Sequence, residues 1–82
     1  HRVADDVQVV QEITIVQDSL LDGATIGEVT SLYRLSIIAH SGGGAWRSQP
    51  ELSTPLGPGE RIQVMVTGAR VAEVHALNRA TS

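Results

Sequence analysis

The sequence predicts an α+β fold: a small, mostly antiparallel four-stranded sheet with two short helices. Apolar and polar residues alternate over Arg61–Thr67 with the two-residue period of a half-buried strand, and related runs occur at Val7–Val16 and Leu35–His40. Between and after these runs, apolar residues recur every three or four positions, as in a helix that covers a sheet. Because the 82-residue chain contains no phenylalanine, its core must consist mainly of aliphatic side chains.

The first predicted strand, Val7–Val16, is apolar mainly on one face. The apolar residues at its odd positions are Val7, Val9, Ile13 and Ile15. Val10 and Val16 add apolar surface to the opposite face. We therefore expect the opposite face to be partly covered, either by a helix or by a second subunit.

A short helix is predicted to follow the loop Gln17–Ala24. Thr25 and Glu28 have the spacing of a capping box, in which each side chain accepts a hydrogen bond from the backbone N–H of the other residue. The apolar stripe of this helix comprises Ile26, Val29 and either Leu32 or Tyr33. We expect this stripe to pack on the sheet.

The second strand, Leu35–His40, is predicted to end at the turn formed by glycines 42–44. A phosphate-binding glycine loop lies between a strand and a helix. Here the glycines lead instead into a short third strand, Ala45–Gln49, which completes a hairpin. The glycines are therefore interpreted as a plain turn.

Two side chains near this hairpin are candidates for function. His40 is expected to be partly exposed at the strand end, on the same face as Ser36 and Ile38, where it could contact a ligand or change its charge. Trp46 is either an interface anchor or a cap on the aliphatic core.

The fourth strand, Arg61–Thr67, is predicted to follow a tight turn at Pro58-Gly59. Proline fixes φ near about −65° and glycine allows a positive φ, as such a turn requires. Glu60 is expected to accept hydrogen bonds from N–H groups of the turn. The prolines keep the preceding segment, Pro50–Pro58, irregular.

A final helix is predicted to begin near Gly68. Its apolar stripe consists of Val71, Val74 and Leu77. Residues 78–82 are expected to fray. The sequence thus divides into an N-terminal tail (1–6), one domain (7–78) and a C-terminal tail (79–82).

Composition excludes several classes of function. The net charge is −3, with six arginines, no lysine and no basic run, which argues against binding a nucleic acid polymer. There are no cysteines, and the three histidines do not have metal-ligand spacing, so no metal site is expected. No Gly-x-Ser-x-Gly elbow or other nucleophile pattern is present. We therefore expect neither an enzyme nor a bound cofactor.

Localisation is predicted to be cytoplasmic. No apolar run approaches the roughly 20 residues needed to cross a bilayer, the first residues do not form a signal peptide, and the lack of cysteine fits a reducing compartment. The chain begins with His1 rather than methionine, so we interpret it as part of a longer protein, either cytosolic or the soluble part of a membrane protein or complex.

The order of turns and strands resembles the TrkA C-terminal domain, also called the RCK C-terminal domain, of bacterial potassium transport and channel proteins. The matching positions in the second half are Pro50, Leu56, Pro58, Gly59, Glu60, Ile62, Val64, Val66 and Gly68. Earlier, Asp18–Glu28 is similar to the loop and short helix that follow the family's first strand, and Leu35–Ala39 to its second strand. The resemblance covers Val7–Leu77.

The resemblance implies a regulatory, ligand-sensing dimerisation module that gates a bacterial potassium or other cation channel, transporter or antiporter. The expected partners are a second copy of the chain and that membrane protein. The family often carries a preceding nucleotide-binding domain, but this sequence has no G-x-G-x-x-G fingerprint. The alternative is a ligand-free structural dimerisation domain of another cytosolic or membrane protein.

Some members of the family bind cyclic di-AMP in a cleft between two copies of this domain. The resemblance places the matching positions at Thr30, Ser36, Ile37, Ile38 and Pro50. Binding members tend to have a basic residue where this chain has Thr30, and Arg34 lies one turn later. Arg34 and His40 complete the predicted ligand-binding set.

Overall fold

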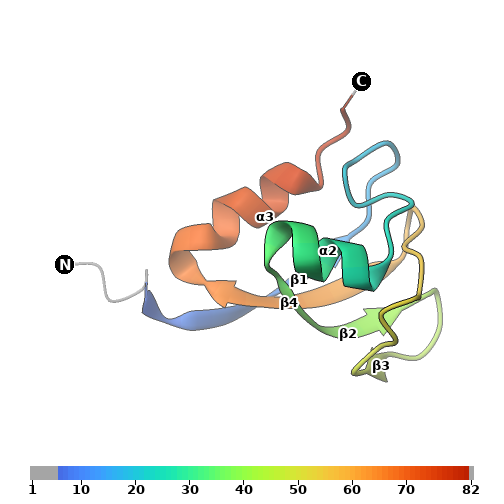
Figure 1. Ribbon diagram of the computed structural model, residues 1–82, viewed down its shortest axis with the longest axis horizontal. Coiled ribbons are helices and arrows are strands. Elements are labelled where there is room, and N and C mark those ends of the chain that lie inside the picture. Colours follow the sequence, from blue (N-terminus) through green and yellow to red (C-terminus); the bar gives the residue numbers. More distant parts are fainter. Residues whose placement is uncertain (1–5, 82) are drawn as a thin grey trace.

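The computed structural model describes residues 6–81, which form a four-stranded antiparallel sheet with its helices on one face (Figure 1). The strands are β1 (Gln8–Thr14), β2 (Ser36–Ser41), β3 (Arg47–Ser48) and β4 (Arg61–Thr67). The helices are α2 (Ile26–Tyr33), the 3₁₀ turn η1 (Gly68–Arg70) and α3 (Val71–Leu77). Strand order is β1-β4-β2-β3. The predicted α+β fold is confirmed.

The core lies between the helices and the central strand β4. Along β4, Ile62, Val64 and Val66 are buried while the residues between them are more exposed, as the alternation predicts. They pack with Val29 of α2 and Val74 of α3, each fully buried. Loop residues complete the core, and these are Ile15, Leu21, Leu35 and Leu56.

The predicted capping box starts α2. The backbone N–H of Glu28 donates to Oγ1 of Thr25 at 3.1 Å, and the backbone N–H of Thr25 donates to Oε1 of Glu28 at 2.8 Å. Tyr33, rather than Leu32, completes the apolar stripe: Tyr33 packs against the core, whereas Leu32 is 70% exposed.

The C-terminal end of α2 is held by Arg70, which precedes α3. The helix ends at Arg34, whose φ of 54° lies in the left-handed region. The Arg70 guanidinium donates to the carbonyl oxygens of Tyr33 (2.6 Å) and Arg34 (2.7 Å). These carbonyls have no partner within the helix, so the guanidinium caps it and ties it to α3.

The predicted position of His40 is wrong. A β-bulge shifts the register of β2 against β4 between Ile37 and Ala39, so that Ile37 pairs with Val64 but His40 pairs with Ile62. The extra residue reverses the alternation. His40 therefore lies on the helix-covered face, not on the face of Ser36, and is only 9% exposed.

The hairpin after β2 is confirmed, with a shorter third strand than predicted. Only Arg47 and Ser48 pair with β2. Glycines 42–44 form a turn, in which the Ser41 hydroxyl donates to the Gly44 carbonyl at 2.9 Å. Trp46 is 36% exposed and lies outside the core, with the Arg61 guanidinium 5.0 Å from the centre of its ring. A core-capping role for Trp46 is therefore not what the structure shows.

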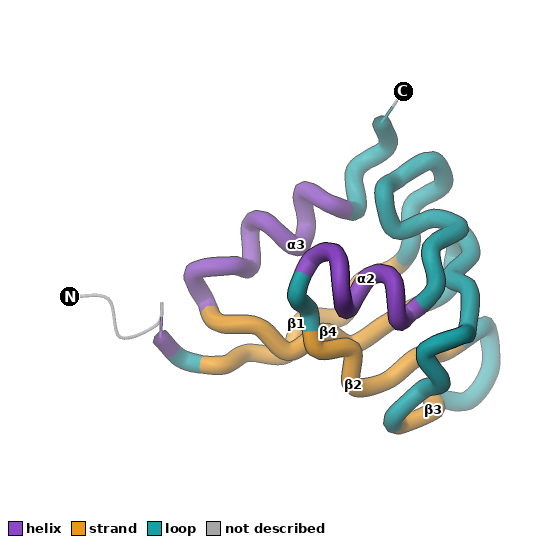
Figure 2. The backbone as a smooth tube through the Cα atoms, viewed as in Figure 1, coloured by secondary structure: helices purple, strands orange, loops and turns teal. Residues whose placement is uncertain are grey.

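The face of the sheet opposite the helices is open. Figure 2 shows α2 and α3 on the same side of the strands. Val10 and Val16 remain 48% and 40% exposed, so no helix within residues 6–81 covers them. The other expectation, cover by a second subunit, stays a prediction.

The C-terminal segment packs on the domain, contrary to the expectation that residues 78–82 fray. Nδ2 of Asn78 donates to the Thr14 carbonyl at 2.7 Å, and the Val16 N–H donates to Oδ1 of Asn78 at 3.0 Å. Thr81 donates to the Asp18 carbonyl from its N–H (3.0 Å) and its hydroxyl (2.8 Å). Of the expected tails, residues 1–5 and 82 lie outside the described residues.

Candidate functional site

A hollow of about 560 Å³ lies between α2, β2 and the segment that follows β3; we call it the β2 hollow. Its lining residues are Ile26, Thr30, Leu35, Ser36, Ile37, Ile38, Ser48, Gln49, Pro50 and Leu52. Five of the seven predicted site residues are among them, namely Thr30, Ser36, Ile37, Ile38 and Pro50. The structure therefore gathers residues that are up to 20 positions apart in the sequence.

The segment after β3 is held in place by the start of α2. The N–H of Ile26 donates to the Thr54 carbonyl at 2.9 Å, and the N–H of Gly27 donates to the Leu52 carbonyl at 2.8 Å. N–H groups in the first turn of a helix have no partner within it, so the segment supplies their acceptors. The helix α2 and the segment after β3, which form two walls of the hollow, are thus fixed to each other.

Gly27 allows this close approach. A Cβ at position 27 would lie 3.1 Å from both the Cβ and the carbonyl oxygen of Leu52. The sequence prediction missed Leu52. A glycine in the first turn of a helix costs stability relative to alanine, so Gly27 was the available signal that another chain segment packs there.

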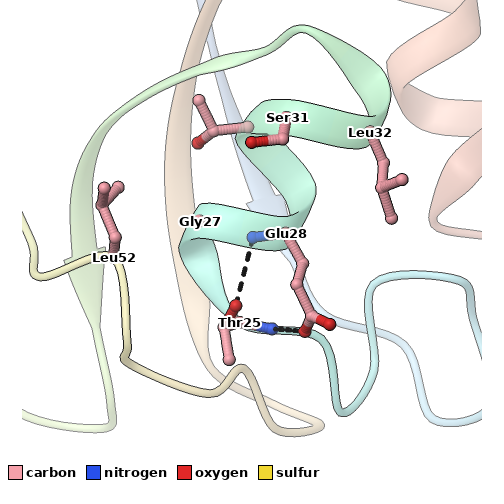
Figure 3. Close-up of a pocket in the computed structure, with 7 residues that line it drawn as sticks. Thr25, Gly27, Glu28, Ser31, Leu32 and Leu52 are labelled. Carbon is pink, nitrogen blue, oxygen red and sulfur yellow. Dashed lines mark hydrogen bonds between the residues drawn. The ribbon is translucent and has the colours of Figure 1, made fainter.

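A second hollow of about 530 Å³ adjoins the first along α2 (Figure 3). Its lining residues are Thr25, Gly27, Glu28, Thr30, Ser31, Leu32 and Leu52. Figure 3 shows the capping box at its base and Leu52 beside Gly27. Thr30 and Leu52 belong to both hollows, and Leu32 and Leu52 are 70% and 64% exposed. The outer surface of α2 therefore carries an exposed apolar region next to the β2 hollow.

The β2 hollow is lined mainly by apolar side chains, together with a few hydrogen-bonding groups. The Thr30 hydroxyl donates its proton to the Ile26 carbonyl within the helix at 2.8 Å, so this proton does not point to a ligand in the hollow. None of the ten lining residues is charged. Such a surface can hold a flat, weakly polar group, but it supplies no charge to bind an anion.

Backbone groups add to this surface. The Gly68–Val7 and Ile15–Glu60 hydrogen bonds show that the even-numbered residues of β4 bond toward β1, so Met65 bonds toward Ser36 of β2 and the N–H and carbonyl of Ile37 point to the other side of β2. On that side β3 pairs with Ala39 and His40, and the Gln49 N–H donates to the Ile38 carbonyl at 3.2 Å. A donor and an acceptor of Ile37 are therefore available at the hollow.

The other two predicted residues lie outside the lining. Arg34 is exposed at the C-terminal end of α2, directly before the lining residue Leu35. His40 lies near the other end of β2, where its Nε2 is 2.8 Å from Oε1 of Glu60. The same carboxylate oxygen accepts from the Gly57 N–H at 3.2 Å, which confirms the role predicted for Glu60 in the turn.

Within residues 6–81, no group of three or more His, Asp or Glu side chains is arranged to hold a metal ion. No helix in the same residues combines the length and apolar character of a membrane span.

The chain has the fold of the RCK C-terminal domain. It is similar to a solved structure described as the RCK_C domain dimer of S. agalactiae BusR in complex with c-di-AMP, with a TM-score of 0.66 and 21% sequence identity. The similarity covers 84% of this chain and 95% of the BusR domain. No family model and no curated protein sequence matches the chain. The fold implied by the resemblance is thus confirmed.

Proposed function

We propose that the chain is a regulatory module that acts as a homodimer and binds a cyclic dinucleotide, with cyclic di-AMP as the first candidate, at the β2 hollow. The supporting observation is that the five positions matched to the family's ligand contacts line one hollow. The similar BusR domain is described as a dimer in complex with this nucleotide.

The chemistry of the hollow suits a purine. Ile37, Ile38 and Pro50 offer apolar surface to a flat ring, and the backbone N–H and carbonyl of Ile37 offer hydrogen bonds to its edge. Binding sites for small molecules commonly combine an apolar lining with a few oriented polar groups in about 300–1,000 Å³.

The phosphates of the ligand need a cation from outside the lining. Arg34 is the nearest arginine in sequence to Leu35, and its exposed side chain is free to turn toward the rim of the hollow. A second protomer that covers the hollow would bring a second Arg34. Two arginines would then match the two negative charges of a cyclic dinucleotide.

The proposed mechanism is allosteric and non-catalytic. Ligand binding between two protomers favours the arrangement of the dimer to which the ligand binds more tightly. In the cytoplasm, an attached cation channel, transporter or antiporter would be gated by this shift. The role in potassium transport rests on the family resemblance.

Titration calorimetry tests the ligand. We expect cyclic di-AMP to bind at one nucleotide per two chains, more tightly than AMP. Thr30→Arg places a cation on the wall of the hollow in a residue type that helices accept well, so affinity should rise by about tenfold or more and depend more steeply on salt. Arg79→Lys, a substitution away from the hollow that keeps the charge, is the control and should change neither the affinity for cyclic di-AMP nor its salt dependence.

A ligand-free dimerisation domain is the second candidate. The observations that favour it are the lack of a charged lining residue and the exposure of Leu32 and Leu52. Three results together would establish this second candidate. The chain sediments as a dimer, and the Leu32→Ser variant sediments as a monomer. No nucleotide, cyclic dinucleotide or monovalent cation in a panel shifts the melting temperature.

A further inference from the structure

The outer edge of β1 is a pairing surface that the proposed function does not use. β1 is one edge strand of the sheet, and β3, which lies beside the β2 hollow, is the other edge strand. The Gly68 N–H donates to the Val7 carbonyl and the Ile15 N–H donates to the Glu60 carbonyl, so the odd-numbered residues of β1 bond toward β4.

The even-numbered residues of β1 therefore direct their backbone groups away from the sheet, since the direction alternates along an antiparallel strand. These residues are Gln8, Val10 and Glu12, for which no other strand in residues 6–81 lies alongside. Among the side chains of the described residues, only that of Gln11 hydrogen-bonds to these groups, and its Nε2 lies 3.4 Å from the Val10 carbonyl. A contact of this length is weak and easily exchanged.

Asn78 closes the C-terminal end of this edge. Its side-chain amide bonds to the Thr14 carbonyl at 2.7 Å and to the Val16 N–H at 3.0 Å, as a neighbouring strand would. The open part of the edge is therefore limited to residues 8–12. This part contains no proline and no lysine, its register with β4 is continuous, and its one charged residue is Glu12, which lies 3.4 Å from the Arg61 guanidinium.

We propose that the edge of β1 pairs in antiparallel fashion with the same edge of a second copy, with the two-fold axis at Val10. In this register Val10 lies opposite the partner's Val10, and Gln8 lies opposite the partner's Glu12. Each such pair exchanges both backbone hydrogen bonds. The two sheets become continuous, and Val10 and Met65, which are 48% and 38% exposed, form an apolar strip across the junction.

The limits of the free edge select this register. A shift of two residues in one direction moves the partner's Glu12 past the start of β1 to Asp6, which lies outside the strand, so the backbone groups of Glu12 lose their partner. A shift in the other direction places Gln8 opposite the partner's Thr14 and needs the Thr14 carbonyl as a hydrogen-bond acceptor, but this carbonyl already accepts a hydrogen bond from Asn78. Only the register centred on Val10 pairs the three free residues with one another.

Pairing at β1 leaves the β2 hollow free because the two lie at opposite ends of the sheet. The contact is therefore independent of the ligand. A chain that uses both surfaces would form assemblies larger than a dimer, since two separate two-fold contacts link each copy to two others.

Cysteine crosslinking tests the proposal, because the natural chain has no cysteine. In Val10→Cys the paired Cα atoms would lie about 5.5 Å apart, within the range of about 4.4–6.8 Å that a disulfide spans. In Met65→Cys, on the same face of the neighbouring strand, the distance would be three strand spacings, or roughly 14 Å. We expect Val10→Cys, but not Met65→Cys, to form a covalent dimer under mild oxidation without ligand. No dimer of Val10→Cys, or equal yields for both variants, would overturn the proposal.

Charge substitution at Gln8 provides a second test that does not rely on oxidation. Gln8→Lys creates two opposite-charge pairs with the partner's Glu12, and Gln8→Glu creates two like-charge pairs. The association constant should rise roughly two- to tenfold for lysine and fall by a similar factor for glutamate. The same pair of changes at Gln17, outside the free edge, is the control. Sedimentation equilibrium that shows no opposite response at Gln8 would exclude this register.

Discussion

Nε2 of His40 lies 2.8 Å from Oε1 of Glu60, and this contact joins the end of β2 to the turn that precedes β4. The same oxygen accepts from the N–H of Gly57, so one carboxylate organises both the strand end and the turn. His40 is nearly buried, and its ring would lose a polar partner if the carboxylate were removed.

Glu60→Ala should lower the free energy of unfolding by about 1–3 kcal/mol, because it leaves a buried histidine nitrogen and a turn N–H without their acceptor. Urea denaturation measures this change. Glu51→Ala, at an exposed position, is the control and should stay within about 0.5 kcal/mol of the natural chain. Equal effects of the two substitutions would show that the His40–Glu60 contact contributes nothing.

Gly27→Ala tests the close packing of α2 on the segment after β3. Alanine is normally favoured over glycine within a helix by about 1 kcal/mol, but here the new Cβ would meet Leu52 at 3.1 Å. The contacted oxygen of Leu52 also accepts the Gly27 N–H, so it cannot retreat without weakening that bond. We expect a net loss of about 1 kcal/mol in urea denaturation.

Gly44→Ala is the matched control for Gly27→Ala. A Cβ at position 44 would have no neighbour within 4 Å, so the change should be close to neutral. A stabilised Gly27→Ala variant would mean that the Leu52 segment yields easily and that the wall of the β2 hollow is not fixed by α2.

The pair formed by Arg70 and Glu73 predicts a loss of stability in acid. A hydrogen bond from the Arg70 guanidinium, at 2.6 Å, lowers the pKa of Glu73 from its ordinary value of 4.5. A carboxyl group with a lowered folded-state pKa contributes stability above its unfolded pKa, and this contribution disappears as the pH falls through the folded value.

The melting temperature of Glu73→Gln should therefore lie below that of the natural chain at pH 7, and the two should converge as the pH falls through the lowered pKa of Glu73. Thermal melts recorded from pH 3 to pH 7 measure this difference. A constant difference across the whole range would show that the effect of residue 73 is not electrostatic.

Arg34 is predicted to combine a structural cost with a functional role. Its φ of 54° is a conformation that glycine adopts without strain, so Arg34→Gly should stabilise the domain by about 0.5–1 kcal/mol. Arg34→Ala removes the same charge but keeps the strained backbone. Both variants should weaken the binding of cyclic di-AMP, and only the glycine variant should gain stability. Unchanged binding in both would exclude Arg34 as the phosphate partner.

The fold was largely predictable because its main elements carry local signals. The alternation in Arg61–Thr67 gave the bounds of β4, and Thr25 with Glu28 marked the start of α2. The bulge in β2 was not predictable, because one extra residue leaves the apolar pattern almost unchanged while it reverses the face of His40. Leu21 and Leu56 are buried in loops, where no periodicity marks them.

The candidate site was only partly accessible from the sequence. The resemblance supplied Thr30, Pro50 and the β2 positions that the structure gathers in one hollow, but it did not supply Leu52. Asn78 was expected to fray, because a polar residue after a short helix has no sequence signal for a contact with a strand edge 64 residues away. Such contacts depend on the tertiary arrangement.

The most direct test of cyclic di-AMP binding at the β2 hollow is a calorimetric titration of the nucleotide into the chain at a concentration where sedimentation shows a dimer. We expect saturable binding with one nucleotide per two chains, strengthened by Thr30→Arg. No heat of binding at high micromolar nucleotide, for both the natural chain and Thr30→Arg, would contradict it.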